Sequence, residues 1–208
     1  MTVGRMLVVR HGESTWNAVR RWQGQADPPL SERGETQARR GALAAPEHGP
    51  FDAIVTSTLQ RAHRTGELIA SALSVPMLAA DAELSERSAG EWEGLTRAEI
   101  ERDFPGYLAV DKRPAGYESD ASIVERSSQA LRRLAVDHSE RTLLVVSHGG
   151  IIHALERAHS GDDGWQRLDN LTGRWFDVTA EGIVPIGARI ALVPDGGPAI
   201  PPPDAGYA

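Results

Sequence analysis

The chain contains no cysteine, and this absence alone removes several kinds of chemistry. Without cysteine there are no disulfide bonds, no zinc site built on thiolates and no enzyme mechanism with a cysteine nucleophile. The sequence also lacks any apolar run near the roughly 20 residues that a helix needs to span a bilayer. Residues 1–5 lead directly into an apolar segment, which leaves no room for a signal peptide. We therefore expect a cytoplasmic protein without a membrane span.

An excess of basic residues is also absent. The sequence has 22 lysines and arginines against 29 aspartates and glutamates, a formal net charge of −7. Nucleic acids and acidic membrane surfaces are bound by basic faces, so neither is an expected partner. An anionic substrate would have to be held by a local group of cationic side chains. The 40% of hydrophobic residues in a chain of 208 is enough for one sizeable domain with a core.

A short apolar run, residues 7–9, ends abruptly in Arg10, His11 and Gly12. An apolar run bounded by turn-forming residues is typical of a buried strand in a parallel sheet. The loop after such a strand lies at the carboxyl edge of the sheet, where open α/β proteins bind their ligands. A guanidinium beside an imidazole suits the binding and transfer of a phosphoryl group. On these residues alone, an Arg-His pair that merely closes a strand is an equal alternative.

Two further segments extend this pattern. Residues 142–147 are the most hydrophobic strand expected in the chain, and His148 with two glycines follows directly. Residues 51–56 are predicted to form another buried strand, and Arg61 begins the helix after it, where the helix N-terminus also favours an anion. Because the carboxyl ends of parallel strands meet at one edge, His11, Arg61 and His148 are expected to converge.

The alternation of strands and helices predicts an α/β fold, a three-layer sandwich whose mostly parallel central sheet is flanked by helices. Residues 84–122 break this alternation and are predicted to form a lid-like excursion over the carboxyl ends of the strands. We expect one domain over residues 1–193 and a tail rich in proline and glycine over residues 194–208. Further strands are expected at residues 75–79, 174–179 and 183–193, and helices at 31–45, 59–73, 122–134 and 151–159.

Three helix starts carry the spacing of a capping box, in which serine or threonine is followed three residues later by glutamate or glutamine. These pairs are Ser57 with Gln60, Thr96 with Glu99, and Ser122 with Glu125. Each pair predicts that the hydroxyl accepts a hydrogen bond from a backbone N–H in the first turn of its helix. Ser31 is predicted to cap the helix that follows it.

Taken in order, these segments resemble the histidine phosphatase superfamily, in the branch that includes cofactor-dependent phosphoglycerate mutases and related small phosphatases. Any one matching segment is a weak signal, but five in the order of the family are a strong one. The resemblance covers roughly residues 5 to 180. The matching segments are residues 7–17, 23–24 together with 29–38, 57–62, 84–94 and 146–150.

The resemblance implies a role for each residue that matches a motif of the family. His11 is the expected nucleophile, whose ring nitrogen attacks phosphorus and becomes phosphohistidine. Arg10, Arg61 and His148 are the expected clamp on the phosphoryl oxygens. Because attack requires a neutral ring, these neighbouring cations should hold the pKa of His11 down. Glu86 corresponds to the proton donor of the family, which protonates the leaving oxygen and then activates water.

Other residues complete the implied site. Asn17 and the backbone N–H of Gly149 are implied as further phosphate donors, and Gln23 and Gly24 match the substrate-side loop of the family. Glu13 is expected to support the loop around the nucleophile. No histidine and carboxylate spacing typical of a metal site is present. The resemblance implies neither a metal nor another cofactor, because the arginines supply the positive charge.

Three functions stay open. The leading hypothesis is a metal-independent phosphomonoesterase that hydrolyses a small phosphorylated metabolite through phosphohistidine on His11. A cofactor-dependent phosphoglycerate mutase would return the phosphoryl group to a bound sugar acid, but mutases of the family usually run longer. A non-catalytic module that binds phosphate ligands would be expected to lack His11 or Glu86, and both are present. Tyr117 stands where relatives often have glycine and would narrow the pocket, so the identity of the substrate stays open. The oligomeric state, monomer or homodimer, cannot be inferred from the sequence.

Overall fold

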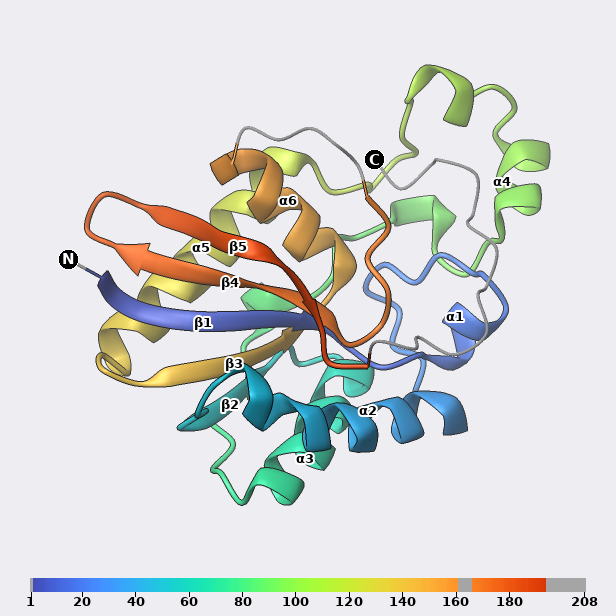
Figure 1. Cartoon of the computed structure of the whole chain (residues 1–208). Coiled ribbons are helices and arrows are strands. Elements are labelled where there is room, and N and C mark those ends of the chain that lie inside the picture. The colour runs from blue at the N-terminus through green and yellow to red at the C-terminus, as the bar shows by residue number, and fades with distance from the viewer. Residues whose placement is uncertain (1, 161–165, 194–208) are drawn as a thin grey trace.

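Figure 1 shows the computed structural model of the chain, which describes residues 2–160 and 166–193. A five-stranded sheet lies at the centre, in the order β2-β3-β1-β4-β5. β1, β2 and β3 pair in parallel, whereas β4 is antiparallel to both β1 and β5. Four strands therefore run in one direction, and the predicted mostly parallel sheet is confirmed. The strands are β1 (Thr2–Arg10), β2 (Ala53–Thr56), β3 (Thr142–Ser147), β4 (Thr172–Thr179) and β5 (Ile183–Ala191).

Helices cover both faces of the sheet, with α2 and α3 on one side and α5 and α6 on the other (Figure 1). None of the described helices is long and apolar enough to cross a membrane. The helices are α1 (Thr15–Ala18), α2 (Glu32–Ala44), α3 (Gln60–Leu73), α4 (Arg97–Asp103), α5 (Asp120–Asp137) and α6 (Gly149–Ser160). Short 3₁₀ helices are η1 (Ala45–His48), η2 (Ala82–Leu84), η3 (Gly90–Trp92) and η4 (Leu108–Val110).

Alternate residues of β1 enter two separate hydrophobic clusters. Met6 and Val8 pack with apolar residues of α5 and α6, and Leu7 and Val9 pack with apolar residues of α2 and α3. A strand covered on both faces needs apolar side chains at every position, which explains the unbroken apolar run in the sequence. The predicted three-layer sandwich is therefore confirmed. The expected tail over residues 194–208 lies outside the described residues.

The strand predicted at residues 75–79 is wrong. This segment runs beside β2, where Ile54 donates to the carbonyl of Pro76 and accepts from Leu78, but it forms a single bridge between Ile54 and Met77. Proline has no N–H to donate to a ladder, so Pro76 limits the pairing at this edge of the sheet. The strand predicted at residues 142–147 is confirmed at both ends as β3.

Two of the three predicted capping boxes are also wrong. Ser57 does not cap α3, because the N-cap is Leu59; the Ser57 hydroxyl accepts from the Leu59 N–H at 3.1 Å, before the first turn, and bonds His148. Ser122 does not cap α5, because Ser119 stands three residues earlier and accepts from the Ser122 N–H. The box between Thr96 and Glu99 at the start of α4 is confirmed. So is the Ser31 cap of α2.

The excursion, residues 84–122, has a hydrophobic core of its own. Trp92 and Ile100 are buried at its centre, with Phe104 and Tyr117 packed against Trp92. In Figure 1 this green segment, with α4, lies beside the loops that follow β1. Trp22 in those loops donates to the carbonyl of Leu95 and accepts from Gly94, so backbone hydrogen bonds join the two segments. The excursion therefore meets the chain just beyond the carboxyl end of β1.

Two glycines let the loop after β1 approach α2 more closely than side chains would permit. A Cβ atom on Gly34 would lie 1.9 Å from the carbonyl oxygen of Glu13, and one on Gly12 would lie 2.6 Å from the carbonyl oxygen of Gly34. The Ser31 N–H donates to that same Glu13 oxygen at 2.9 Å and holds it in place. The loop and the first turn of α2 therefore pack backbone against backbone.

This contact predicts that Gly34→Ala lowers the free energy of unfolding by about 1–3 kcal/mol, the usual cost of forcing an extra methyl group into a packed site. The loss should occur although alanine normally stabilises a helix by about 1 kcal/mol relative to glycine. Urea unfolding measures the change. Gly41→Ala in the same helix is the control, because its Cβ would meet the flexible end of Leu171 at 3.1 Å. Equal stability of the two variants would contradict the packing argument.

Candidate active site

The register of three parallel strands brings their carboxyl ends to one level. Arg10 at the end of β1 pairs with Ser147 at the end of β3, and Thr56 at the end of β2 pairs with Val146. The ladder continues one step further, because His11 donates its N–H to Ser147 at 3.0 Å and Ser57 donates to Val146 at 3.0 Å. The backbones of His11, Ser57 and His148 therefore lie side by side at the carboxyl ends of the three strands.

Three of the predicted side chains lie together in the interior. The rings of His11 and His148 are 5.1 Å apart between centroids, at an interplanar angle of 62°. The Arg61 Nε donates to His11 Nε2 at 3.2 Å. The exposed fractions are 2% for His11 and 0% for both Arg61 and His148. The structure thus brings together residues that are up to 137 positions apart, from 11 to 148.

The hydrogen bonds of His11 fix which ring nitrogen carries the proton. Nδ1 lies 2.6 Å from the carbonyl oxygen of Gly12, which can only accept, so Nδ1 is the protonated nitrogen. Nε2 accepts from Arg61 and keeps its lone pair. Burial and then the charges of Arg61 and Arg10 hold the pKa of His11 well below its usual value. The ring is therefore neutral near pH 7, with Nε2 directed at the guanidinium.

In His148, Nε2 has a hydrogen-bond partner and Nδ1 has none among the described residues. Its Nε2 lies 2.9 Å from the Ser57 hydroxyl. Its Nδ1 is buried and has no hydrogen-bond partner among the described residues. Burial, followed by the charge of Arg61, holds the pKa of His148 well below its usual value, so the ring is neutral. If the Ser57 hydroxyl donates its hydrogen bond to Nε2, the one ring proton is on Nδ1, the nitrogen that remains to donate.

Arg61 is a buried cation whose hydrogen-bond acceptors are neutral. Besides His11 Nε2, it donates from Nη1 to the carbonyl of Ala26 at 2.8 Å and from Nη2 to that of Gly24 at 2.9 Å. Burial lowers the pKa of Arg61 to about 10, while the carboxylates of Glu86 and Asp27 act in the opposite direction. The guanidinium keeps its charge at neutral pH, and an anion is the group that such a site favours.

The Arg10 side chain lies at the same strand end. Its Nη1 donates to the carbonyl of Leu168 at 2.6 Å. A Cβ atom on Gly149 would lie 3.7 Å from Arg10 Cδ, so the arginine stem passes beside the first residue of α6. The charge of Arg10 also acts on the pKa of both His11 and His148. Arg10 is therefore part of the same positive cluster.

The Glu86 side chain lies at the N-terminus of α6, where it contacts Gly150, the second residue after His148. Its Oε2 accepts from the Gly150 N–H at 3.1 Å, and its Oε1 accepts from the Arg87 N–H at 2.8 Å. The free N–H groups at a helix start favour a negative side chain there. The predicted carboxyl group is thus next to the histidine and arginine cluster.

Asn17 and Gln23 meet at the fully buried Ser14 instead of at His11. Asn17 Oδ1 accepts from the Ser14 N–H in a capping box at the start of α1, and Gln23 Oε1 accepts from the Ser14 hydroxyl at 2.6 Å. Gly24 enters the cluster through its carbonyl, which accepts from Arg61. The amide nitrogens of Asn17 and Gln23 are the groups with which these residues could donate to a ligand.

The sequence did not point to several residues that support the cluster. Asn170 donates to the carbonyl of His11 at 2.8 Å, and Ser57 holds His148. Ser85 joins the hydroxyls of Ser57 and Thr58 at 3.3 and 3.2 Å. A lone asparagine carries no detectable signal, whereas Ser57 stood in a matched segment and was taken for a helix cap.

Two further predictions concern neighbouring residues. Glu13 accepts from the Ser31 hydroxyl at 2.8 Å and from Arg33 at 3.1 Å, so it supports the loop after β1 as expected. Tyr117 packs its ring against Trp92 in the core of the excursion. Burial raises the pKa of Tyr117. Narrowing of a pocket by Tyr117 stays a prediction.

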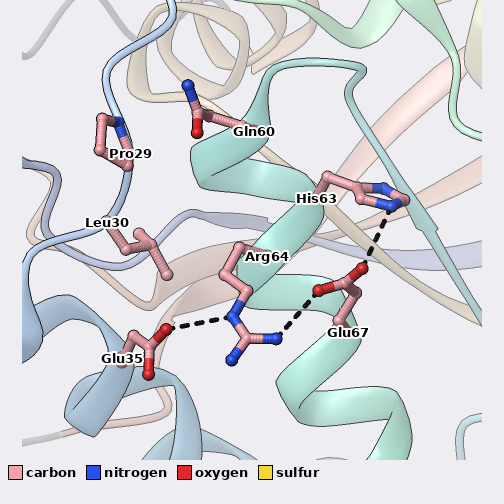
Figure 2. A pocket seen from close by; sticks show the side chains of 7 residues that line it. All are labelled: Pro29, Leu30, Glu35, Gln60, His63, Arg64 and Glu67. Atoms are coloured by element: carbon pink, nitrogen blue, oxygen red, sulfur yellow. Dashed lines mark hydrogen bonds and ion pairs between the residues drawn. The ribbon is translucent and has the colours of Figure 1, made fainter.

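A surface pocket of about 350 Å³ lies elsewhere, between α2 and α3 (Figure 2). Its polar groups pair with one another, because Arg64 binds both Glu35 and Glu67 at 3.1 Å and His63 lies 3.5 Å from Glu67. None of the predicted site residues lines it; the lining residues are Pro29, Leu30, Glu35, Gln60, His63, Arg64 and Glu67. In the described part of the chain, no three histidine, aspartate or glutamate side chains gather as a metal site would require.

Residues 6–182 match the histidine phosphatase superfamily (branch 1), and the chain belongs to this family. It is 35% identical over 161 residues to phosphoglycerate mutase-like protein 4 of Arabidopsis thaliana, covering 74% of this chain and 70% of that protein. It is 33% identical over 171 residues to the glucosyl-3-phosphoglycerate phosphatase of Mycobacterium tuberculosis, covering 76% of each. The solved structure of a mycobacterial glucosyl-3-phosphoglycerate phosphatase with VO3 matches with a TM-score of 0.77 and 28% identity, over 88% of this chain and 96% of that one. The family predicted from the sequence motifs is thus confirmed.

The lowered pKa values predict that His11 and His148 stay neutral as the pH falls through 6.5, the usual histidine value. Nitrogen-15 NMR of histidine-labelled protein measures the protonation of each ring nitrogen. For His11 we expect an Nδ1–H ring with unprotonated Nε2 below that pH, because burial and the arginines oppose a second proton. The unfolded chain in urea is the control and should titrate at about 6.5. A folded-state midpoint near 6.5 for His11 would contradict the assignment.

Proposed function

We propose that this member of the family is a metal-independent phosphomonoesterase that acts through phosphohistidine on His11. The observation that carries the proposal is the hydrogen bond from Arg61 to His11 Nε2, at 3.2 Å, inside a buried positive cluster. A lone pair on a neutral nitrogen is the group that attacks phosphorus, and the adjacent guanidinium is the group that holds phosphoryl oxygens. A nucleophilic nitrogen and a cation that can bind phosphoryl oxygens are therefore adjacent.

In the first step, the hydrogen bond from Arg61 Nε to His11 Nε2 gives way to the substrate, the freed Nε2 lone pair attacks phosphorus, and the ester P–O bond breaks. The N–H groups of Arg61 and Arg10 and the Nδ1–H of His148 donate to the phosphoryl oxygens, where negative charge gathers in the transition state. The buried Nδ1 of His148, which lacks a partner among the described residues, is supplied with an acceptor by this arrangement. Arginines can carry this stabilisation without a metal, which supports metal independence.

Glu86 is the proposed proton donor. Its carboxyl group protonates the leaving alcohol oxygen as the ester bond breaks. In the second step the carboxylate takes a proton from water, the water oxygen attacks phosphorus, and the P–N bond to His11 breaks with release of phosphate. The place of Glu86 at the start of α6, hydrogen-bonded to Gly150 two residues after His148, supports this role.

The proposed substrate is a small phosphorylated metabolite. Asn17, Gln23, Gly24 and the backbone N–H of Gly149 are proposed to contact it. The Gly24 carbonyl binds Arg61, Gly149 follows His148 at the start of α6, and Asn17 and Gln23 bind Ser14 in the segment that continues from His11. The relatives named as acting on glucosyl-3-phosphoglycerate support a small phosphate ester as the class. The cytoplasmic location stays a prediction from the sequence. The identity of the ester and the oligomeric state stay open.

A phosphoglycerate mutase is the alternative from the same family. It uses the same first step and differs in the acceptor, which is a bound phosphoglycerate instead of water. The phosphatase names among the relatives favour hydrolysis, although one relative is named mutase-like. A binding module without catalysis is disfavoured because a nucleophilic lone pair and a carboxyl group both stand at the cluster.

The proposal predicts that the protein hydrolyses p-nitrophenyl phosphate equally well with and without EDTA. Brief reaction with ³²P-labelled substrate should leave an acid-labile, alkali-stable label, and His11→Ala should remove both turnover and label because the attacking nitrogen is gone. Absorbance at the nitrophenolate band and labelling after an alkaline quench are the measurements, and loss of the label in acid identifies phosphohistidine. His63→Ala is the control, since His63 lies on α3 at the pocket of Figure 2 and should keep both. Strict EDTA sensitivity, or labelling of His11→Ala, would overturn the proposal.

Loss of the Glu86 proton predicts that Glu86→Gln slows cleavage of phenyl phosphate by about 10²–10⁴-fold, the usual contribution of a general acid. Steady-state kinetics of the folded variant measure the change in kcat/KM. Glu91→Gln, an exposed carboxylate in the same excursion, is the control and should stay within about 3-fold of the parent enzyme, which is under 1 kcal/mol. If Glu86→Gln behaves like the control, another group supplies the proton.

A further inference from the structure

Arg126 on α5 reaches across to the segment that carries Glu86. Its Nη1 donates to the carbonyls of Glu83 and Ser85 at 2.7 Å each, and its Nη2 donates to the carbonyl of Glu86 at 3.2 Å. One guanidinium therefore fixes three carbonyls within four successive residues. The planar fork of an arginine suits such multiple contacts, because its donors point in set directions.

A carboxylate on the far side orients the same guanidinium. Glu118 accepts from Arg126 Nε at 2.7 Å and from Nη2 at 2.8 Å. The exposed fractions of the two side chains are 18% for Arg126 and 12% for Glu118, so the pair is largely removed from water. Burial opposes ionisation of Glu118, but hydrogen bonds from Arg126 and Ser122 outweigh it and hold its pKa below the usual value. The carboxylate is ionised and keeps the guanidinium in one orientation.

The segment held by Arg126 also touches the histidine cluster. The Ser85 hydroxyl lies 3.3 Å from the Ser57 hydroxyl, which in turn bonds His148 Nε2 at 2.9 Å. The Glu86 carbonyl accepts a second hydrogen bond, from Gln25 Nε2 at 3.2 Å. Movement of this segment would therefore change where the Glu86 carboxyl group stands relative to the phosphoryl-binding residues.

We propose that Arg126, oriented by Glu118, is a positioning residue that sets the Glu86 carboxyl group against the leaving oxygen of the substrate. This inference rests on the proposed function, because it requires Glu86 to be the proton donor. Arg126 touches no reacting atom; it acts by fixing the backbone on either side of Glu86. A displacement of about 1 Å in such a group costs about 10²-fold in rate.

The experiment compares two aryl phosphates of similar shape that differ in their need for a proton. Phenyl phosphate releases a basic phenolate, so its cleavage depends on the general acid, whereas 2,4-dinitrophenyl phosphate releases a stable anion without protonation. We expect Arg126→Gln to lower kcat/KM for phenyl phosphate by about 10- to 100-fold. For 2,4-dinitrophenyl phosphate we expect a loss under about 3-fold, because His11 and the phosphate clamp are unchanged.

The ratio of the two kcat/KM values is the decisive quantity. Both values come from one preparation, so the fraction of folded enzyme cancels and partial misfolding does not affect the ratio. Arg126→Lys is the second variant: it keeps the charge near Glu118 but lacks the fork that reaches three carbonyls, so its ratio should shift by a smaller factor. Arg133→Gln is the matched control, since Arg133 lies two turns further along α5 and binds the carboxylates of Asp81 and Glu83 while 46% exposed.

The outcomes separate this inference from the proposed function. Glu86→Gln must show the same dependence on the leaving group; if it does not, Glu86 is not the proton donor and both proposals fall. If Glu86→Gln shows it and Arg126→Gln slows both substrates equally, Arg126 supports the fold alone and the inference is wrong. Unchanged rates in Arg126→Gln, or an equal shift in Arg133→Gln, would overturn it as well.

Discussion

The site depends on one constraint, a guanidinium that is fully buried among neutral hydrogen-bond acceptors. Arg61 donates to an imidazole nitrogen and to two backbone carbonyls. Burial of a charge is costly unless it is hydrogen-bonded, and these acceptors engage three of the five guanidinium N–H donors without cancelling the charge. Burial, and then the positive field of Arg61, hold the pKa of His11 down and keep its ring neutral. The same field favours an anion, so Arg61 contributes both to the neutral imidazole and to the affinity of the site for a phosphoryl group.

The rest of the fold holds the ring that faces this guanidinium. The parallel register of β1 and β3 places His11 and His148 at one edge, and Gly12 and Gly34 let the loop of His11 press directly on α2. The Gly12 carbonyl holds Nδ1, and Asn170 holds the His11 carbonyl from the other side. These contacts use backbone atoms and one short side chain, so little freedom is left to His11, the proposed nucleophile. A preorganised site of this kind has little reorganisation to undergo when charge develops.

The sequence was sufficient for the central sheet and for the family. The unbroken apolar runs of β1 and β3 predicted a sheet covered on both faces, and the order of motifs predicted the family. It failed where a local pattern competed with a long-range contact. Ser57 had the spacing of a helix cap, but its hydroxyl is used by His148, which lies 91 residues away. Asn170 and Arg126 could not be found at all, because the contacts by which they reach the site are with backbone carbonyls, which any residue would present.

The residues proposed for chemistry and those proposed to determine specificity belong to different parts of the fold. The histidines and Arg61 stand on strand ends and helix starts, whereas residues 84–122 are stabilised by an aromatic core around Trp92. Because that core is built from residues of the excursion and Trp22, substitutions around it can reshape the substrate side without disturbing the β1–β3 register. Glu86, the proposed proton donor, is the exception, since it belongs to the excursion yet lies next to the histidine and arginine cluster through its hydrogen bond with Gly150. The buried pair of Arg126 and Glu118 ties this one carboxyl-bearing segment to α5, which packs on the sheet, and so couples the variable part to the fixed one.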